Sequence, residues 1–170
     1  QRWYFQCSKS FEPGKPIFVY IGGEGSVNRL PDGAWYEYGE RLGACMFALE
    51  HRYYGQSQLV TSFTAENMVY LSSYHGLADL AAWLEFIKQG AGGIFPPMSD
   101  ARVVVFGGSY PGDLSAWARQ QFPELVDGSV ASSAPVQMLW NFGPLQDRTF
   151  GGLIGNPLTG GGELCSQRVQ

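Results

Sequence analysis

Residues 102–112 decide the fold of this chain and read RVVVFGGSYPG. The run of three valines and a phenylalanine predicts a strand that is buried on both faces. Two glycines then interrupt the run, and Ser109 follows them directly. Further along, apolar residues recur at helical spacing, at Leu114, Trp117, Ala118 and Phe122. The stretch therefore predicts a strand, a sharp turn that carries a serine, and a helix.

A serine in such a turn is typical of the nucleophile elbow of an α/β-hydrolase. The turn strains the serine backbone and lifts the hydroxyl clear of the sheet, while the next helix points free N–H groups toward it. A side chain at Gly107 would collide in so sharp a turn. The motif departs from G-x-S-x-G at its last position, where Pro111 stands. The alternative is an ordinary turn in a chain of 23 glycines, and the flanking strand and helix favour the elbow.

Length, composition and charge argue against several classes of function. The chain has 170 residues, 45% of them hydrophobic, which suffices for one globular core. The net charge is −4 and no basic cluster occurs, so we expect no nucleic acid partner. No apolar run approaches the ~18 residues of a membrane span. We expect no metal and no cofactor, because neither metal-ligand spacing nor a nucleotide-binding motif is present. The pairing of Cys7, Cys45 and Cys165 stays open.

The rest of the chain predicts an α/β domain with a mostly parallel sheet flanked by helices. Expected strands are an edge strand at 3–6 and buried or short strands at 16–21, 45–50 and 126–132. Expected helices lie at 34–42 and 73–89, where apolar residues recur at helical spacing. We expect a core over residues 1–136, and a glycine-rich segment over residues 137–170 that leads towards a cap domain.

Two loops at the ends of strands are candidates for the site. Glycine-rich residues 22–25 follow the second strand, and the backbone N–H of Gly23 or Glu24 would complete an oxyanion hole with that of Tyr110. The alternative is a plain turn that ends the strand. Tyr53 and Tyr54 lie in the next loop and are candidates for a substrate pocket.

The same loop carries Glu50 and Arg52. Two interpretations are open for it: Arg52 takes part in a site, or Glu50 and Arg52 fix the loop through ion pairs and hydrogen bonds. We favour the second for Arg52.

The histidines do not complete a catalytic triad. His51 and His75 are the only two, and both precede Ser109, whereas α/β-hydrolases place Asp or Glu and then His after the serine. His51 as the general base conflicts with this topology. His75 stands at the start of a predicted helix and is interpreted as a surface or capping residue.

Several short motifs occur in order along residues 1–136: GGEG at 22–25, EHRYYG at 50–55, GGSY at 107–110, LSAW at 114–117 and ASSAPV at 131–136. Together they resemble the prolylcarboxypeptidase family, which includes dipeptidyl peptidase II and thymus-specific serine protease. The resemblance implies a lysosomal or secreted, proline-directed serine exopeptidase that acts on peptides. It matches Ser109 to the nucleophile and the Tyr110 N–H to an oxyanion donor.

Members of that family carry a helical cap after the ASSAPV stretch, and their catalytic Asp and His lie beyond it. No position here matches those two residues. We therefore expect a partial α/β-hydrolase fold without the last strands and the cap, inactive alone, that needs a C-terminal segment or a partner chain. Whether the amino or the carboxyl end of a peptide is recognised stays open. An esterase or lipase of the same fold, and an inactive binding module, are the alternatives.

Overall fold

The computed structural model describes residues 1–141, 143, 147–159 and 161–169. The chain divides into two compact units, Gln1–Val136 and Gln137–Gln170. The first unit contains the whole sheet and all residues of the candidate site.

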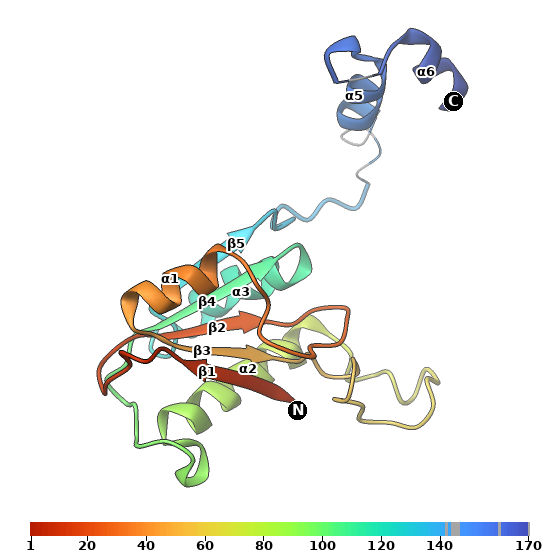
Figure 1. Cartoon of the computed structure of the whole chain (residues 1–170). Coiled ribbons are helices and arrows are strands. Elements are labelled where there is room, and N and C mark those ends of the chain that lie inside the picture. The colour runs from red at the N-terminus through yellow and green to blue at the C-terminus, as the bar shows by residue number, and fades with distance from the viewer. Residues whose placement is uncertain (142, 144–146, 160, 170) are drawn as a thin grey trace. The chain divides into compact units, whose positions relative to one another are not determined.

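The first unit is built on a five-stranded sheet with strand order β1-β3-β2-β4-β5 (Figure 1). The strands are β1 (Trp3–Cys7), β2 (Ile17–Ile21), β3 (Cys45–Leu49), β4 (Val103–Gly108) and β5 (Gly128–Ser132). All neighbours pair in parallel except β1, which runs antiparallel to β3. The mostly parallel sheet is confirmed. The direction of β1 could not be read from its short sequence, which has the same pattern either way.

The helices lie on both faces of the sheet. They are α1 (Ala34–Leu42), α2 (Ser73–Lys88) and α3 (Tyr110–Gln121). Because side chains alternate along a strand, Ile17 and Val19 of β2 pack with buried residues of α2 and α3, while Phe18 packs with Trp35 of α1. Both faces of the central strands are therefore apolar, as the continuous hydrophobic runs predicted.

The α1 face of the sheet is less completely covered than the other. It bears an open apolar groove of about 510 Å³, whose lining includes Phe18, Trp35, Phe106 and Val130. Val130 belongs to β5, the edge strand of the sheet, and is 45% exposed.

A disulfide joins the two strands at the other edge. Cys7 of β1 stands directly opposite Cys45 of β3 in the register, and the two are bonded. Cys165 is a free, exposed cysteine in the second unit. The structure thereby selects one pairing where the sequence left three.

The second unit consists of short helical segments. They are a π-helical turn η2 (Asp147–Gly151), α5 (Gly152–Gly155), the turn η3 (Pro157–Thr159) and α6 (Glu163–Val169). The glycine-rich segment thus forms helices of four to seven residues and a 3-10 turn among its described residues. Leu153 and Leu158 remain exposed, so this unit gains little stability from apolar burial.

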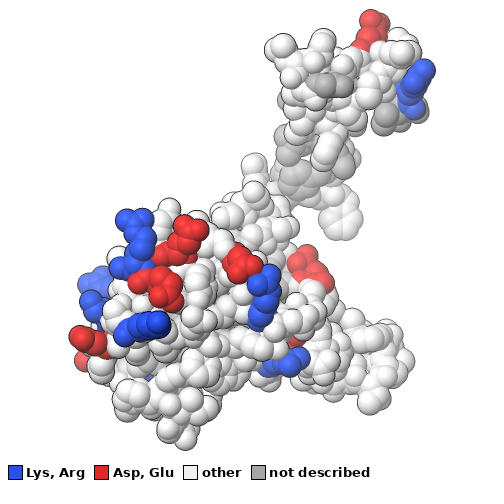
Figure 2. Space-filling model, in the orientation of Figure 1, with Lys and Arg blue, Asp and Glu red and all other residues white. Residues whose placement is uncertain are grey.

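Among the described residues, no helix combines the length and the apolar character that a membrane span needs. Figure 2 shows lysine and arginine side chains interspersed with aspartate and glutamate side chains over the first unit. That face therefore carries no extended field of one sign.

Candidate active site

The turn between β4 and α3 has the backbone geometry of a nucleophile elbow. Ser109 adopts φ 59° and ψ −130°, a conformation that costs free energy for a residue with a side chain. Its N–H donates to the carbonyl oxygen of Ser132 at 3.0 Å, and its own carbonyl accepts the N–H of Gly112 at 2.9 Å. The strained residue is therefore held from both sides, by β5 and by the first turn of α3.

Close contacts explain why Gly107 and Gly112 of this turn carry no side chain. A Cβ at Gly107 would lie 2.0 Å from the carbonyl oxygen of Pro111, and one at Gly112 would lie 2.9 Å from the Cβ of Ala134. The second position with no room for a side chain is thus 112, whereas the strict motif would place its last glycine at 111. Pro111 instead turns its ring onto Gly23, where a Cβ would lie 2.4 Å from the proline Cγ.

The loop after β2 offers free backbone donors beside the elbow. We call residues 22–27 the β2-end loop. It is fixed at its start, where the Gly22 N–H donates to the Leu49 carbonyl at 2.8 Å, and at its end, where the Val27 N–H donates to Oε1 of Glu50 at 3.0 Å. Within the described part of the chain, the N–H groups of residues 23–26 donate to no protein atom. Backbone N–H groups of this kind can bind an oxyanion.

The Tyr110 N–H is the other predicted donor. Tyr110 is the first residue of α3, so its N–H has no carbonyl one turn earlier within the helix to bond. The Pro111 ring on Gly23 brings the first turn of α3 against the β2-end loop. The three residues predicted as oxyanion donors, Gly23, Glu24 and Tyr110, therefore come from two segments that touch.

A cavity of about 310 Å³ lies between these segments and the start of α2. Its lining residues are Glu24, His51, Tyr54, Leu71, Ser72, Ser73 and Tyr110. The two tyrosines predicted for a substrate pocket differ in position. Tyr54 lines this cavity, whereas Tyr53 is buried with φ 68° and donates its hydroxyl to the Asn67 carbonyl at 2.6 Å. Of the predicted pair, only Tyr54 is placed to meet a ligand here.

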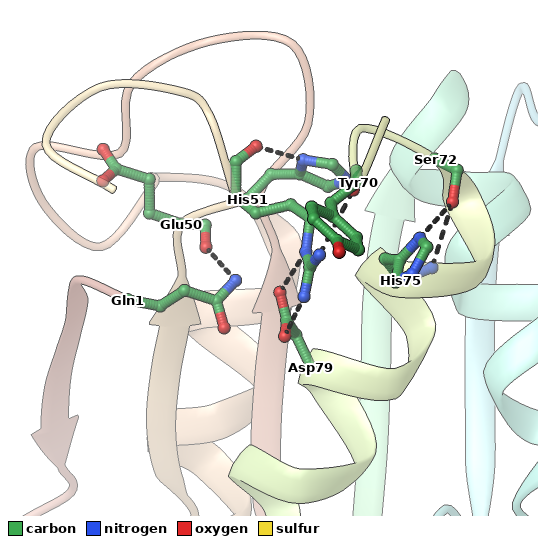
Figure 3. A network of polar contacts seen from close by, with 8 residues as sticks. Gln1, Glu50, His51, Tyr70, Ser72, His75 and Asp79 are labelled. Carbon is green, nitrogen blue, oxygen red and sulfur yellow. Dashed lines mark hydrogen bonds and ion pairs between the residues drawn. The ribbon is translucent and has the colours of Figure 1, made fainter. Parts of the chain in front are cut away.

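The loop after β3 is fixed by its charged residues. We call residues 50–57 the β3-end loop. Arg52 forms a bidentate ion pair with Asp79 of α2, with Nε 2.6 Å from Oδ2, and its Nη1 donates to the Tyr70 carbonyl at 3.2 Å (Figure 3). The bond to Asp79 also raises the pKa of Arg52. The prediction that Arg52 fixes the loop rather than serving a site agrees with these contacts.

His51 uses both ring nitrogens in support of the elbow. Nδ1 lies 2.8 Å from the Arg52 carbonyl oxygen, which can only accept, so Nδ1 carries the proton (Figure 3). Nε2 lies 3.0 Å from the Tyr110 hydroxyl and accepts from it. Burial lowers the pKa of His51, against the opposing effects of the Arg52 carbonyl and Asp79. Burial thus favours the neutral imidazole, whose acceptor nitrogen is occupied by Tyr110 rather than by Ser109.

His75 lies in the first turn of α2. Ser72 is the N-cap of α2, and its Oγ accepts the His75 N–H at 3.3 Å and lies 2.8 Å from His75 Nδ1 (Figure 3). The capping residue is therefore Ser72, and His75 is a half-buried partner of the cap rather than the cap itself. Neither histidine of the chain forms a hydrogen bond with Ser109 among the described residues.

The sequence left open that Glu50 helps to fix its loop, but it gave no sign that two carboxylates of the site are buried. Glu50 is fully buried at 0% exposure and accepts from both loops. Asp113, in the first turn of α3, is 1% exposed, and burial raises its pKa. A charged residue type normally indicates a surface position, so only the fold reveals these two. Within the described ranges, no group of three or more histidine, cysteine, aspartate or glutamate side chains is arranged to hold a metal ion.

The family model of serine carboxypeptidase S28 matches residues 1–170. The chain is 40% identical over 144 residues to a mouse (Mus musculus) thymus-specific serine protease, covering 84% of the chain and 28% of that protein. It is 39% identical over 138 residues to prolyl carboxy peptidase like protein 5 of Caenorhabditis elegans, covering 78% and 27%. It is 32% identical over 176 residues to bovine (Bos taurus) lysosomal Pro-X carboxypeptidase, covering 100% and 34%. The chain thus spans about a quarter to a third of the length of these relatives.

A solved structure shares the fold at low identity. The dipeptidyl peptidase 4 of Porphyromonas gingivalis superposes with a TM-score of 0.55 at 16% identity, over 76% of this chain and 18% of that one. At this identity the likeness concerns the fold alone, and it agrees with the predicted α/β-hydrolase architecture.

Proposed function

Because the chain belongs to the serine carboxypeptidase S28 family, we propose that it carries the nucleophile of a serine-type exopeptidase that cleaves peptides at proline. One observation carries the assignment to this site: Ser109 stands at positive φ between β4 and α3, where Gly107 admits no side chain. A strained serine held by neighbouring backbone is the structural mark of a nucleophile in this fold.

The proposed reaction is acyl transfer through Ser109. Oγ attacks the carbonyl carbon of the scissile peptide bond while its proton passes to a general base. The negative charge on the carbonyl oxygen is stabilised by the N–H of Tyr110 and by an N–H of the β2-end loop, at Gly23 or Glu24. The tetrahedral intermediate then expels the amine, which takes the proton from the base, and leaves an ester on Ser109. Water repeats the sequence and releases the acid.

The base and the residue that orients it are proposed to come from outside these 170 residues. His51 accepts from Tyr110 and His75 contacts Ser72, and neither histidine forms a hydrogen bond with Ser109 among the described residues. In support, the relatives are much longer than the region that matches: the match covers 27% and 28% of the length of two of them. The 170 residues alone are therefore expected to be inactive.

The cavity beside Tyr110 is the proposed subsite for the substrate. It combines the aromatic rings of Tyr54 and Tyr110 with Leu71, and flat apolar surfaces of this kind suit a proline ring. Two relatives are named as prolyl or Pro-X carboxypeptidases, which supports cleavage at proline and, more weakly, release from the carboxyl end. A dipeptidyl peptidase activity remains the alternative for the same site.

We further propose a lysosomal or secreted location. Cys7 and Cys45 form a disulfide, and disulfides persist mainly in oxidising compartments. One relative is a lysosomal protein by name.

The full-length protein and its Ser109→Ala variant test the function. The wild type should release the terminal residue or dipeptide from Xaa-Pro reporters, and the variant should lose at least about a thousand-fold in kcat. Hydrolysis of simple esters without turnover of any proline peptide would favour an esterase. Absence of turnover with all substrates, in a protein that is folded, would favour a binding module. Either outcome would overturn the proposal.

A further inference from the structure

The buried Glu50 carboxylate connects the loops that surround the elbow. Its Oε1 accepts the Val27 N–H at 3.0 Å, and its Oε2 accepts the Gln56 N–H at 3.0 Å and the Ser57 hydroxyl at 2.6 Å. No ion pair involves Glu50 among the described residues. A buried carboxylate without a cation is costly unless several donors satisfy it. Three donors do so here, and one of them belongs to the β2-end loop.

The surroundings of the carboxylate leave it one position. Gly55 has φ 53°, and a Cβ there would lie 1.9 Å from Oε1. The backbone of Glu50 is fixed as well, because its N–H donates to the Arg2 carbonyl at 2.9 Å and its carbonyl accepts Nε2 of Gln1 at 3.0 Å (Figure 3). Ser57 is fixed in turn by the Arg2 N–H, which donates to its Oγ at 2.9 Å. The Glu50 carboxylate is therefore held in place and can fix the position of the groups that donate to it.

Glu50 fixes the carboxyl-terminal end of the β2-end loop through the Val27 N–H. Gly22 is fixed to β3 at the start of that loop and Val27 to Glu50 at its end, while the N–H groups between them have no protein partner in the described part of the chain. An isolated stretch of four residues with free donors would otherwise take many conformations. Oxyanion stabilisation depends on donors that are in place before the reaction.

We propose that Glu50 is a positioning residue of the oxyanion hole, acting through the Val27 N–H on the free donors of the β2-end loop. This inference rests on the proposed function of Ser109. It assigns Glu50 no contact with substrate: its effect is on the transition state, where the charge develops, and not on the binding of the uncharged ground state. Loss of the anchor should therefore lower kcat and leave KM nearly constant.

Three variants of the full-length protein test the proposal on a Xaa-Pro reporter. Glu50→Gln keeps the volume but presents an NH₂ group to one of the donors, and we expect kcat to fall about 10- to 100-fold with KM within about two-fold. Ser57→Ala removes one of the three donors and should show the same pattern with a several-fold loss in kcat. Ser57→Thr keeps the hydroxyl and should recover most of that loss.

The outcomes separate the two proposals. If the wild type turns over no reporter, the proposed function fails before Glu50 is tested. If the wild type is active and Glu50→Gln is folded, by circular dichroism and thermal melting, with unchanged kcat, the positioning role is overturned. Should Glu50→Gln not fold, the two Ser57 variants decide, and equal kcat for Ser57→Ala and wild type overturns the proposal. A rise in KM with constant kcat also contradicts it, because that would indicate direct binding of substrate.

Discussion

The elbow and the β3-end loop both follow a buried parallel strand at the same edge of the sheet. They differ in whether their polar side chains form hydrogen bonds. At the elbow, Ser109 is strained, and its hydroxyl forms no hydrogen bond among the described residues. In the β3-end loop, the side chain of Glu50 accepts from Val27 of the β2-end loop and from Gln56 and Ser57 of its own loop, and Arg52 is held by Asp79 and Tyr70.

This difference separates a residue available for chemistry from residues that support it. A free hydroxyl on a strained backbone persists only where the surroundings impose it. The β3-end loop supplies part of that support, since His51 accepts from Tyr110 and Glu50 from Val27. The following substitutions disturb the two regions in turn.

The largest expected effect is at the elbow itself. Gly107→Val places a branched side chain where even a Cβ would lie 2.0 Å from the Pro111 carbonyl, and relief would require the turn to open. We expect an insoluble protein, or a soluble one with activity reduced at least about a hundred-fold, measured by turnover and by melting temperature. Gly108→Ala is the matched control, because its Cβ would meet only the Ser132 carbonyl oxygen at 3.8 Å. An active, stable Gly107→Val protein would show that the turn is ordinary.

An intermediate effect is expected in the β3-end loop. Asp79→Asn removes the anion from a pair whose side chains are 13% and 21% exposed, and a loss of about 2 kcal/mol in the free energy of unfolding should follow. Urea denaturation measures it. The control is Asp32→Asn, in an ion pair whose side chains are 74% and 81% exposed, where we expect about 0.5 kcal/mol or less. Equal losses for both variants would contradict the supporting role of Arg52.

The smallest effect concerns pH. Burial lowers the pKa of His51 below its usual 6.5, so below about pH 6.5 the unfolded chain binds a proton that the folded chain does not. The stability contributed by neutral His51 is complete above that pH and is lost as the pH falls through the lowered folded value. The charges of Asp79 and Glu24 raise the pKa of His51 and the charge of Arg52 lowers it, and burial determines the direction of the shift.

The comparison of wild type with His51→Gln isolates this contribution. Glutamine can still accept from Tyr110 but does not titrate, so wild type should lose more stability than the variant between pH 7 and pH 5. Melting temperatures across that range give the result. Parallel curves for the two proteins would mean that His51 is not held neutral by its surroundings.

Most of the fold follows from local sequence patterns. The α1 bounds agree with the prediction, and the apolar runs at β2, β3 and β4 were recognisable because strands buried on both faces carry few polar residues. The glycines and the serine of the elbow were also recognisable in the sequence, because the sharp turn leaves room for few residue types.

What the sequence could not supply depends on contacts between distant segments. The burial of Glu50 and the bond from Tyr110 to His51, 59 residues apart, arise from the order of strands in the sheet. Pro111 stands where the strict motif has glycine, and its contact with Gly23 likewise depends on two segments that are distant in the sequence. In the described part of residues 137–170, the short helices form without a repeat of apolar residues that would predict them.

The central claim is that Ser109 is the nucleophile, and the site of covalent modification tests it most directly. The full-length protein is treated with a fluorophosphonate, digested, and analysed by mass spectrometry to locate the adduct. The account predicts a single phosphonyl group on the peptide that contains Ser109, and no labelling of the Ser109→Ala variant. A wild-type adduct on another serine, or equal labelling of wild type and variant, would contradict it.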